Sequence, residues 1–315
     1  MSANTEQTQE EFKNQSVTIN KPIVLAGATG HLGQRIAHHI LQRGGAVRLL
    51  VRKRSTAIEI NALREKGGAV VEVDFGSISD LTQACAGGSC VVSALSGLRE
   101  VIVDVQSRLL WAAVDAGVPR FIPSDYCIDF TKLVPGSNRN LDLRREFAEV
   151  VDKAPIAATS VLNGMFTDLL TGQAPVVLSG PKLVLYWGNA DQPLDFTTME
   201  NTAAFTASAA LDPTTPRFLR IAGEVSTIRG LQKSALEAFG KQFRTLRLGG
   251  LGGLSTMIKI TKTVFPQKEE VFPAWQGMQY LHDMFTGLPK LEPLDNDRYP
   301  AIGWTSVREV LATAK

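Results

Sequence analysis

The sequence predicts an α/β fold with a doubly wound parallel sheet and a smaller C-terminal lobe. Up to about Gly164, short apolar runs alternate with helical patterns, which is the order of elements in a sheet built from parallel β-α-β units. The apolar runs are rich in Val and Ile and do not alternate with polar residues, as expected for strands covered on both faces. Three glycines between the first run and the first helical pattern indicate a tight strand-to-helix turn.

The predicted elements of this first part follow one another without long gaps. The expected strands cover residues 22–28, 46–52, 69–75, 89–95, 120–124 and 156–162. The expected helices cover residues 31–45, 55–68, 77–88, 99–118 and 140–154. In the first helix, Leu32, Ile36 and Ile40 recur at the spacing of one helical face, so this helix presents an apolar stripe to the sheet.

After Gly164 the pattern is less regular, which predicts a second, smaller lobe. A hairpin is expected first, over 175–189, with its turn at 179–181. A helix over 197–213, a strand over 216–223 and a helix over 227–242 are expected to follow it. The glycine-rich segment 247–257 is interpreted either as a flexible connection or as a mobile lid. The expected organisation is a flexible leader over 1–20, a sheet domain over 21–165, and a lobe over 166–315 with segments that return to the sheet domain.

Composition excludes several classes of protein. The 315 residues carry a formal net charge of +2, without the basic excess of a nucleic-acid binder. No apolar run approaches the roughly 20 residues that cross a bilayer, and the leader has no apolar segment of a secretory signal. Three cysteines without metal-ligand spacing indicate a reducing compartment and no metal site. We therefore expect a cytoplasmic protein that binds neither nucleic acid, nor membrane, nor metal.

Gly27, Gly30 and Gly33 lie between the first strand and the first helix. At these positions, glycine permits a tight turn, the close approach of a pyrophosphate, and close packing of the helix on the strand. The amino end of the helix adds unpaired N–H groups and a partial positive charge that favour phosphate. The pattern predicts the dinucleotide-binding loop of a Rossmann fold, and the alternative is a turn that serves packing alone.

The end of the second strand indicates which dinucleotide binds. NAD sites place an acidic residue there for the ribose hydroxyls, whereas this chain has Arg52, Lys53 and Arg54 followed by two hydroxyl side chains. Adjacent cations suit a 2′-phosphate, so we expect NADP, with a solvated run of charge as the alternative. Residues 21–165 are then an NADP-binding Rossmann domain, and residues 166–315 are its substrate-binding lobe.

Further segments carry a likeness to a known group of enzymes. They read GATGHLGQRI, LVRKRST, VDFGSISDL, VVSALSG, RFIPSDY, LNGMF and YPAIGWTSVREVL. With them the chain resembles the NmrA-like and isoflavone-reductase-like group of atypical short-chain dehydrogenases/reductases, over nearly its whole length from residue 21. The resemblance implies that Arg52 and Lys53 bind the 2′-phosphate. It implies that the rest of the cofactor lies along Thr29, Gly30, His31, Leu32, Asp74, Phe75, Ser93, Ala94, Leu95, Ser96, Pro123, Ser124, Asn163, Gly164 and Met165.

The chain lacks the proton donors typical of these enzymes. None of its four tyrosines has a lysine four residues on, so the Tyr-x-x-x-Lys pair is absent. In the K-x-x-x-R-R run of the isoflavone-reductase-like enzymes, the lysine position is Asn140 here. Tyr126 follows the fifth strand, at the sheet edge where the nicotinamide is expected, and Lys132 lies in the next loop. These two are the predicted proton donor and the cation that tunes it, with packing and a solvated charge as the alternatives.

Two functions fit these observations. The first is an NADPH-dependent reductase of a small aromatic or quinone-like substrate, and its candidate pocket residues are Met165, Phe166, Trp187, Phe272, Trp275 and Phe285. The second is a non-catalytic, NmrA-like redox sensor that binds the dinucleotide and regulates a protein partner. A homodimer is compatible with both functions. An epimerase or dehydratase is less favoured because Tyr-x-x-x-Lys is absent.

Overall fold

A six-stranded parallel sheet in the order β3-β2-β1-β4-β5-β6 is the centre of the amino-terminal domain. Its strands are β1 (Ile23–Ala26), β2 (Val47–Arg52), β3 (Ala69–Val73), β4 (Cys90–Ser93), β5 (Arg120–Ile122) and β6 (Ala157–Ala158). This strand order is that of a Rossmann fold, and it confirms the predicted doubly wound parallel sheet. The computed structural model describes residues 21–53 and 55–314, so the leader predicted over 1–20 lies outside the described residues.

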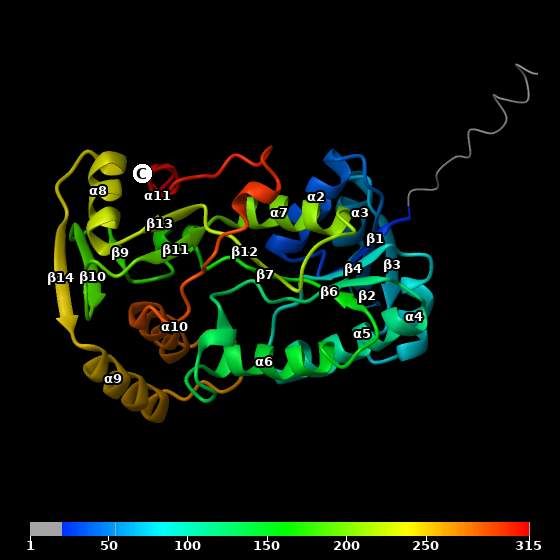
Figure 1. Ribbon diagram of the computed structural model, residues 1–315, viewed down its shortest axis with the longest axis horizontal. Coiled ribbons are helices and arrows are strands. Elements are labelled where there is room, and N and C mark those ends of the chain that lie inside the picture. Colours follow the sequence, from blue (N-terminus) through cyan, green and yellow to red (C-terminus); the bar gives the residue numbers. More distant parts are fainter. Residues whose placement is uncertain (1–20, 54, 315) are drawn as a thin grey trace, which may run out of the picture.

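Helices cover both faces of this sheet, and an apolar cluster fills the space on each side. Figure 1 shows α4, α5 and α6 on one face and α2 with α7 on the other. The helices of the domain are α2 (His31–Gln42), α3 (Ala57–Glu65), α4 (Ile78–Cys85), η1 (Glu100–Val105), α5 (Gln106–Asp115), α6 (Arg139–Val151) and α7 (Met199–Leu211). Because α7 comes from the second half of the chain, that half contributes to the covering of the Rossmann sheet.

The helix predicted over 99–118 is divided in two. Its first part, η1, is a π-helical turn, and α5 continues from it without a break. At the junction, the Gln106 side chain donates to the Ile102 carbonyl at 2.7 Å and accepts the Ser124 N–H at 3.0 Å. Single π-helical turns inside helices are frequent at functional sites. Here the turn fixes the backbone that follows β5, which is one of the strands that end at the expected nicotinamide position.

Within the described residues, the second lobe is built from three small sheets and five helical segments. In the first sheet, β7 (Ser160–Leu162) pairs with β12 (Phe218–Arg220). In the second, β11 (Leu194–Thr197) lies between β8 (Met165–Phe166) and β13 (Glu224–Ser226). In the third, β10 (Leu183–Trp187) lies between β9 (Val177–Leu178) and β14 (Arg244–Gly249). The helical segments are η3 (Thr167–Thr171), α8 (Ile228–Phe239), α9 (Leu251–Val264), α10 (Ala274–Thr286) and α11 (Val307–Ala312). Two short 3-10 turns, η2 (Phe130–Lys132) and η4 (Asn296–Arg298), complete the chain. No helix of residues 21–53 and 55–314 is long and apolar enough to cross a membrane.

Two further predicted elements differ from the structure. The strand expected over 156–162 divides into β6, which joins the Rossmann sheet, and β7, which pairs with β12. The glycine-rich segment 247–257 is not a flexible connection, because it completes β14 and begins α9. Gly249 has φ +148° and Gly250 is the N-cap of α9, so glycine serves the turn from strand to helix here. The hairpin expected around 179–181 is confirmed by the antiparallel pairing of β9 with β10.

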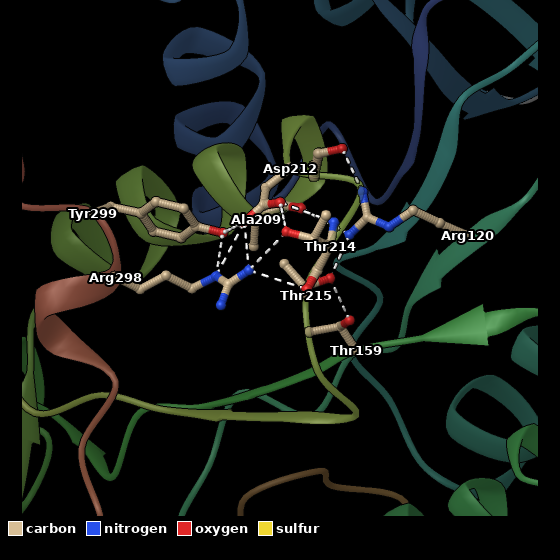
Figure 2. A network of polar contacts seen from close by, with 9 residues as sticks. Arg120, Thr159, Ala209, Asp212, Thr214, Thr215, Arg298 and Tyr299 are labelled. Atoms are coloured by element: carbon tan, nitrogen blue, oxygen red, sulfur yellow. Dashed lines mark hydrogen bonds and ion pairs between the residues drawn. The ribbon is translucent and has the colours of Figure 1, made fainter.

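A polar network ties the end of α7 and the chain around η4 to the Rossmann sheet (Figure 2). From β5, the buried Arg120 donates to the Ala209 and Ala210 carbonyls at 2.8 and 3.0 Å. The Asp212 carboxylate accepts two hydrogen bonds from the Arg298 guanidinium, at 2.8 and 3.0 Å, and one from the Tyr299 hydroxyl at 2.9 Å. The network therefore satisfies the last carbonyls of α7 and holds the returning chain against them.

Asp212→Asn should destabilise the protein at neutral pH. Burial alone raises the pKa of Asp212, but the donors from Thr214, Tyr299 and Arg298 outweigh it and hold the pKa below its ordinary value. The stabilisation is therefore complete above the unfolded-state pKa of about 4 and is lost as the pH falls through the folded-state value. We expect the free energy of unfolding to fall by about 2 kcal/mol at pH 7, measured by urea unfolding.

The difference in the free energy of unfolding between the variant and the parent should shrink as the pH falls below about 4. Asp191→Asn is the matched control, because the Asp191–Arg229 ion pair at 2.7 Å is largely exposed. An exposed pair of this kind contributes about 0–1 kcal/mol, so this control should change little. A loss from Asp212→Asn that stays constant between pH 7 and pH 3 would contradict the role of its charge.

Candidate functional site

The three glycines after β1 have different surroundings. Gly27 has φ +89°, and a Cβ there would lie 2.5 Å from the Ala94 carbonyl oxygen. A Cβ on Gly33 would lie 2.2 Å from the Gly27 carbonyl oxygen. At Gly30, the nearest described atom would be 3.4 Å away, and the residue is exposed. Gly27 and Gly33 are thus required by the turn and by the packing of α2 on β1, whereas Gly30 leaves space on the outer side of the loop.

The amino end of α2 opens into that space. Gly30 is the N-cap and offers no side-chain hydrogen bond, and the first turn holds no acidic residue. Thr29 and His31 are exposed and Leu32 is partly buried, so the loop backbone is accessible. Unpaired N–H groups at the start of a helix form a binding site for phosphate. The loop therefore has the shape and the polarity that a pyrophosphate requires.

Arg52, the last residue of β2, and Lys53, which follows it, differ in whether they form an ion pair. Arg52 is exposed and makes no ion pair with any residue in the described part of the chain. Lys53 instead donates to the Asp80 carboxylate of α4 at 2.6 Å, and this hydrogen bond raises the pKa of the lysine. A 2′-phosphate at this position would meet Arg52 directly, but it would have to compete with Asp80 for Lys53. Arg54 lies outside the described residues.

Asp74 and Phe75 follow β3 at the same edge of the sheet. Arg52 is in register with Val73, so these residues lie beside the end of β2. The Asp74 carboxylate accepts the Gly76 N–H at 2.8 Å and is exposed, whereas the partly buried Phe75 packs on the core. The structure thus brings the residues predicted for the adenine end to one place, where Asp74 faces solvent.

The ends of β4 and β5 lie at the opposite half of this edge, and the chain after β7 joins them there, because the Asn163 N–H donates to the Cys127 carbonyl at 3.0 Å. Ser93 is completely buried, and its hydroxyl has no hydrogen-bond partner among the described residues. Asn163 is also completely buried, and neither end of its carboxamide is bonded within residues 21–53 and 55–314. Buried polar groups in this state are rare, and they suit a ligand that binds them. They fit the ribose hydroxyls and the carboxamide of a nicotinamide nucleotide.

The other residues predicted for this half lie beside Ser93 and Asn163. The Ser124 hydroxyl donates to the Leu95 carbonyl at 2.6 Å, which joins the chain after β5 to the chain after β4. The predicted positions follow the strands directly, as Ala94, Leu95 and Ser96 after β4, Pro123 and Ser124 after β5, and Gly164 and Met165 after β7. Gly164 has φ +69°, and a Cβ there would lie 2.4 Å from the Asp195 carbonyl oxygen.

The structure argues against Tyr126 as the proton donor. Its side chain is 7% exposed and packs in the core cluster that includes residues of β1, α2 and α7. Its hydroxyl is buried, and burial raises the pKa of the phenol far above its ordinary value. A proton donor has to reach the substrate. The prediction for Tyr126 is therefore corrected, because its ring points into the core instead of the cleft.

Lys132 does not act on Tyr126 either. It ends η2, and its amine donates to the Lys290 carbonyl at 2.6 Å and lies 3.8 Å from the buried Asp129 carboxylate. The structure therefore does not bring the two predicted catalytic residues together. Lys132 instead connects η2 to the chain after α10.

Several of the candidate pocket residues are structural. Trp187, Trp275 and Phe285 are buried, and Trp275 donates to the Pro266 carbonyl at 3.0 Å beneath the guanidinium of Arg139. Phe272 is 60% exposed. The partly buried Met165 and Phe166, which follow Gly164 in β8, are therefore the apolar residues nearest in sequence to the predicted nicotinamide position.

Asn140, at the lysine position of the isoflavone-reductase-like run, is fully engaged. Its amide donates to the Val271 carbonyl at 2.9 Å, and its oxygen accepts a hydrogen bond from Arg139 at 3.1 Å. The side chain thus fastens the chain before α10 onto α6. Arg144, one turn further along the same run, donates to the Asn140 carbonyl at 3.0 Å.

Known proteins are similar to this chain in sequence. The family model for the NmrA-like family matches residues 19–248. The chain is 28% identical over 208 residues to Pinoresinol reductase 1 of Arabidopsis thaliana, a match that spans 61% of this chain and only 65% of that relative's length. It is 24% identical over 315 residues to the bifunctional pinoresinol-lariciresinol reductase of Forsythia intermedia, spanning 92% and 97% of the two chains.

Solved structures share the fold over nearly the whole chain. AtPrR2 with NADP+ and (+)pinoresinol is similar with a TM-score of 0.78 and 22% identity, covering 94% of this chain and 99% of that one. The binary complex of leucoanthocyanidin reductase and NADPH from Vitis vinifera gives a TM-score of 0.77 at 17% identity, with coverage of 93% and 99%. These similarities confirm the Rossmann-type α/β fold.

Proposed function

The chain belongs to the NmrA-like family, and from this premise we propose that it is an NADPH-dependent reductase of a small aromatic substrate. The proposal rests on two places along one sheet edge where polar groups have no partner within the described residues. At one end, Gly30 leaves the amino end of α2 open, and at the other the buried Asn163 carboxamide has no partner among the described residues. The relatives named for pinoresinol and lariciresinol reduction support this choice, as do the similar structures named with NADP+ or NADPH.

The proposed roles follow from position along the edge. The α2 amino end holds the pyrophosphate, Arg52 holds the 2′-phosphate, and Ser93 and Asn163 hold the nicotinamide nucleoside. When bound, the cofactor supplies a hydride. Met165 and Phe166 offer apolar surface beside Gly164, which favours a flat aromatic or quinone-like substrate.

A redox sensor without catalysis is the second candidate function. The observation that favours it is that the usual proton donors are absent from the sequence, and that Tyr126, the candidate to replace them, is buried in the core. A sensor of this kind acts through a protein partner. That partner, a homodimer and a cytoplasmic location stay predictions.

NADPH oxidation distinguishes the two functions. The assay follows NADPH absorbance across a panel of quinones, aromatic aldehydes and enones, with each compound also tested without protein. A reductase should oxidise NADPH with at least one of them. Tight NADPH binding by titration calorimetry, with no oxidation by any panel member, would favour the sensor instead.

Arg52→Ala should remove most of the preference for NADPH over NADH. A charge-assisted contact to phosphate contributes about 1.5–3 kcal/mol, so NADPH affinity should fall about tenfold or more while NADH affinity is unchanged. Lys53→Ala should have the smaller effect because Asp80 already holds that amine. Titration calorimetry with both cofactors measures the two constants, and equal affinity of the unmodified protein for NADPH and NADH would contradict the assignment.

A further inference from the structure

The strand β14, the helix α9 and the loop after them carry charge of one sign only. Residues 240–268 contain six Lys or Arg side chains and no Asp or Glu. Since this segment contributes +6 to a total formal charge of +2, the remainder of the chain carries −4. All six cations are exposed, at Lys241, Arg244, Arg247, Lys259, Lys262 and Lys268. The positive charge of the protein is therefore concentrated in one segment.

No carboxylate neutralises these six cations. None of them forms an ion pair with another residue of 21–53 and 55–314. Exposed cations of the neighbouring helix α8 are paired instead, as Arg229 is with Asp191 at 2.7 Å and Lys233 with Glu237 at 3.9 Å. The segment 240–268 therefore presents uncompensated positive charge to its surroundings.

The same segment exposes apolar side chains between the cations. On β14, Leu246 and Leu248 are 43% and 47% exposed. On α9, Ile260 and Val264 lie one turn apart and are 58% and 59% exposed, and Phe265 directly after the helix is 61% exposed. Single exposed apolar residues are ordinary on a protein surface, whereas a group of them marks an interaction site.

This surface projects from the second lobe. Figure 1 shows β14 and α9 at the end of the molecule far from the Rossmann sheet. β14 is the edge strand of its three-stranded sheet, and Leu254 is the one buried residue of α9. The inner side of α9 packs on α10, where Ser255 and His282 share a hydrogen bond of 2.9 Å. The described residues therefore leave the outer side of the helix uncovered.

We propose that residues 240–268 form a docking surface for an anionic lipid bilayer. The cations lie beside the anionic headgroups, and Ile260, Val264 and Phe265 enter the boundary between headgroups and acyl chains. A bilayer accepts a projecting surface of cations and apolar side chains, because it has no fixed shape to match. The inference does not depend on the proposed reductase function, since this surface lies at the other end of the molecule from the Rossmann sheet.

A second copy of this chain or a partner helix fits this surface less well. If two copies paired along the open edges of β14, Arg244 and Arg247 would lie beside the same two residues of the other copy. Like charges placed opposite each other destabilise such a pairing. A partner helix docks its apolar side into a groove, whereas α9 projects. Charge and shape therefore favour the bilayer.

The expectation from composition that the chain binds no membrane does not apply to this surface. It rests on the absence of an apolar run long enough to cross a bilayer. A folded protein can adsorb on a bilayer through exposed side chains without such a run. The small net charge of the whole chain also conceals the separation of +6 in this segment from −4 elsewhere.

Co-sedimentation of the full chain with vesicles tests the surface. The protein should bind vesicles of phosphatidylcholine mixed with phosphatidylserine, and it should bind vesicles of phosphatidylcholine alone at least about tenfold more weakly. Binding to the mixed vesicles should weaken as the salt concentration rises, because salt screens the attraction. Equal binding to both kinds of vesicle, or no binding to the mixed vesicles at low salt, would overturn the proposal.

Arg247→Gln combined with Lys259→Gln tests the cations. Each cation near an anionic surface contributes about fivefold to binding, so this double variant should bind the mixed vesicles about 25-fold more weakly. Arg229→Gln with Lys233→Gln is the matched control, because it removes the same charge from exposed, paired cations of α8. The control should stay within about threefold of the parent, since the attraction falls off within a Debye length. Equal losses in both would show that net charge, and not this surface, drives binding.

Ile260→Ser combined with Phe265→Ser tests the apolar contact. This double variant should bind the mixed vesicles about tenfold or more weakly, because it removes side chains that leave water in the bilayer. Thermal unfolding should match that of the parent, because both side chains are exposed. Vesicle binding equal to the parent's would overturn the insertion of this helix.

A second copy as the occupant gives a different result. The unmodified protein would then be a dimer by light scattering, Leu246→Asp would convert it to a monomer, and neither would bind the mixed vesicles. This outcome would overturn the bilayer as the partner of residues 240–268.

Discussion

Gly30→Val should abolish dinucleotide binding and leave the fold intact. A Cβ at Gly30 meets no described atom closer than 3.4 Å, and φ is −80°, so the backbone accepts a side chain without strain. The valine would project into the open space at the start of α2 and exclude the pyrophosphate. A charge-assisted hydrogen bond to phosphate contributes about 1.5–3 kcal/mol, and the valine would prevent several of them, so NADPH affinity should fall at least about 100-fold by titration calorimetry.

Gly33→Ala is the matched control for this variant. Its Cβ would lie 2.2 Å from the Gly27 carbonyl oxygen, so α2 has to move away from β1. Overpacking of this kind costs about 1–3 kcal/mol or more, and Gly33→Ala should lose stability along with binding. Gly30→Val should stay folded and lose no more than about 1 kcal/mol, because valine is a poorer N-cap than glycine. A folded Gly30→Val protein with the parent's NADPH affinity would show that the glycine turn serves packing alone.

Gly164→Ala should destabilise the protein strongly, although it adds only one methyl group. The residue has φ +69°, and its Cβ would lie 2.4 Å from the Asp195 carbonyl oxygen and 2.7 Å from the Asp195 Cβ. The left-handed conformation costs alanine about 1–2 kcal/mol, and the backbone clash adds about 1–3 kcal/mol. Asp195 has little freedom to move, because its carboxylate holds the Leu291 N–H at 2.9 Å and pairs with Lys290. We expect the free energy of unfolding to fall by about 2–5 kcal/mol, measured in urea.

Gly180→Ala provides the comparison for Gly164→Ala. Gly180 lies in the turn between β9 and β10, where a Cβ would meet no described atom within 4 Å. Its free energy of unfolding should stay within about 0.5 kcal/mol of the parent. If Gly164→Ala were equally neutral, the close approach of the two chain segments at Asp195 would not be a constraint on the fold.

Patterns within short segments of the sequence were sufficient to predict the Rossmann domain. The order of short apolar runs and helices predicts the parallel sheet, and the distinct constraints on Gly27 and Gly33 are those that a strand-to-helix turn imposes. Patterns within a segment do not reveal partners from elsewhere in the chain. Lys53 was predicted for the 2′-phosphate, but Asp80, which is 27 residues away, binds its amine.

The predicted catalytic residues show a second limit. Position after β5 places Tyr126 at the correct edge of the sheet, but it does not determine whether the ring points into the cleft or into the core. That orientation depends on how β1, α2 and α7 pack around the ring, which no spacing in the sequence encodes. The fold was thus accessible from periodicity, whereas the direction of this side chain required tertiary structure.

The division of the predicted 156–162 strand has a mechanical consequence. Only Thr159 separates β6, in the Rossmann sheet, from β7, in the sheet of the second lobe. Its N–H donates to the Phe121 carbonyl at 3.0 Å, the next N–H donates to the Arg217 carbonyl at 2.8 Å, and its hydroxyl bonds Thr215 at 2.7 Å. A rotation of one lobe against the other has to break bonds on both sides of this residue. The two lobes therefore lack a hinge at this crossing. A chimera that joins the lobes of two relatives here would disrupt hydrogen bonds to both sheets, because the crossing is not a free linker.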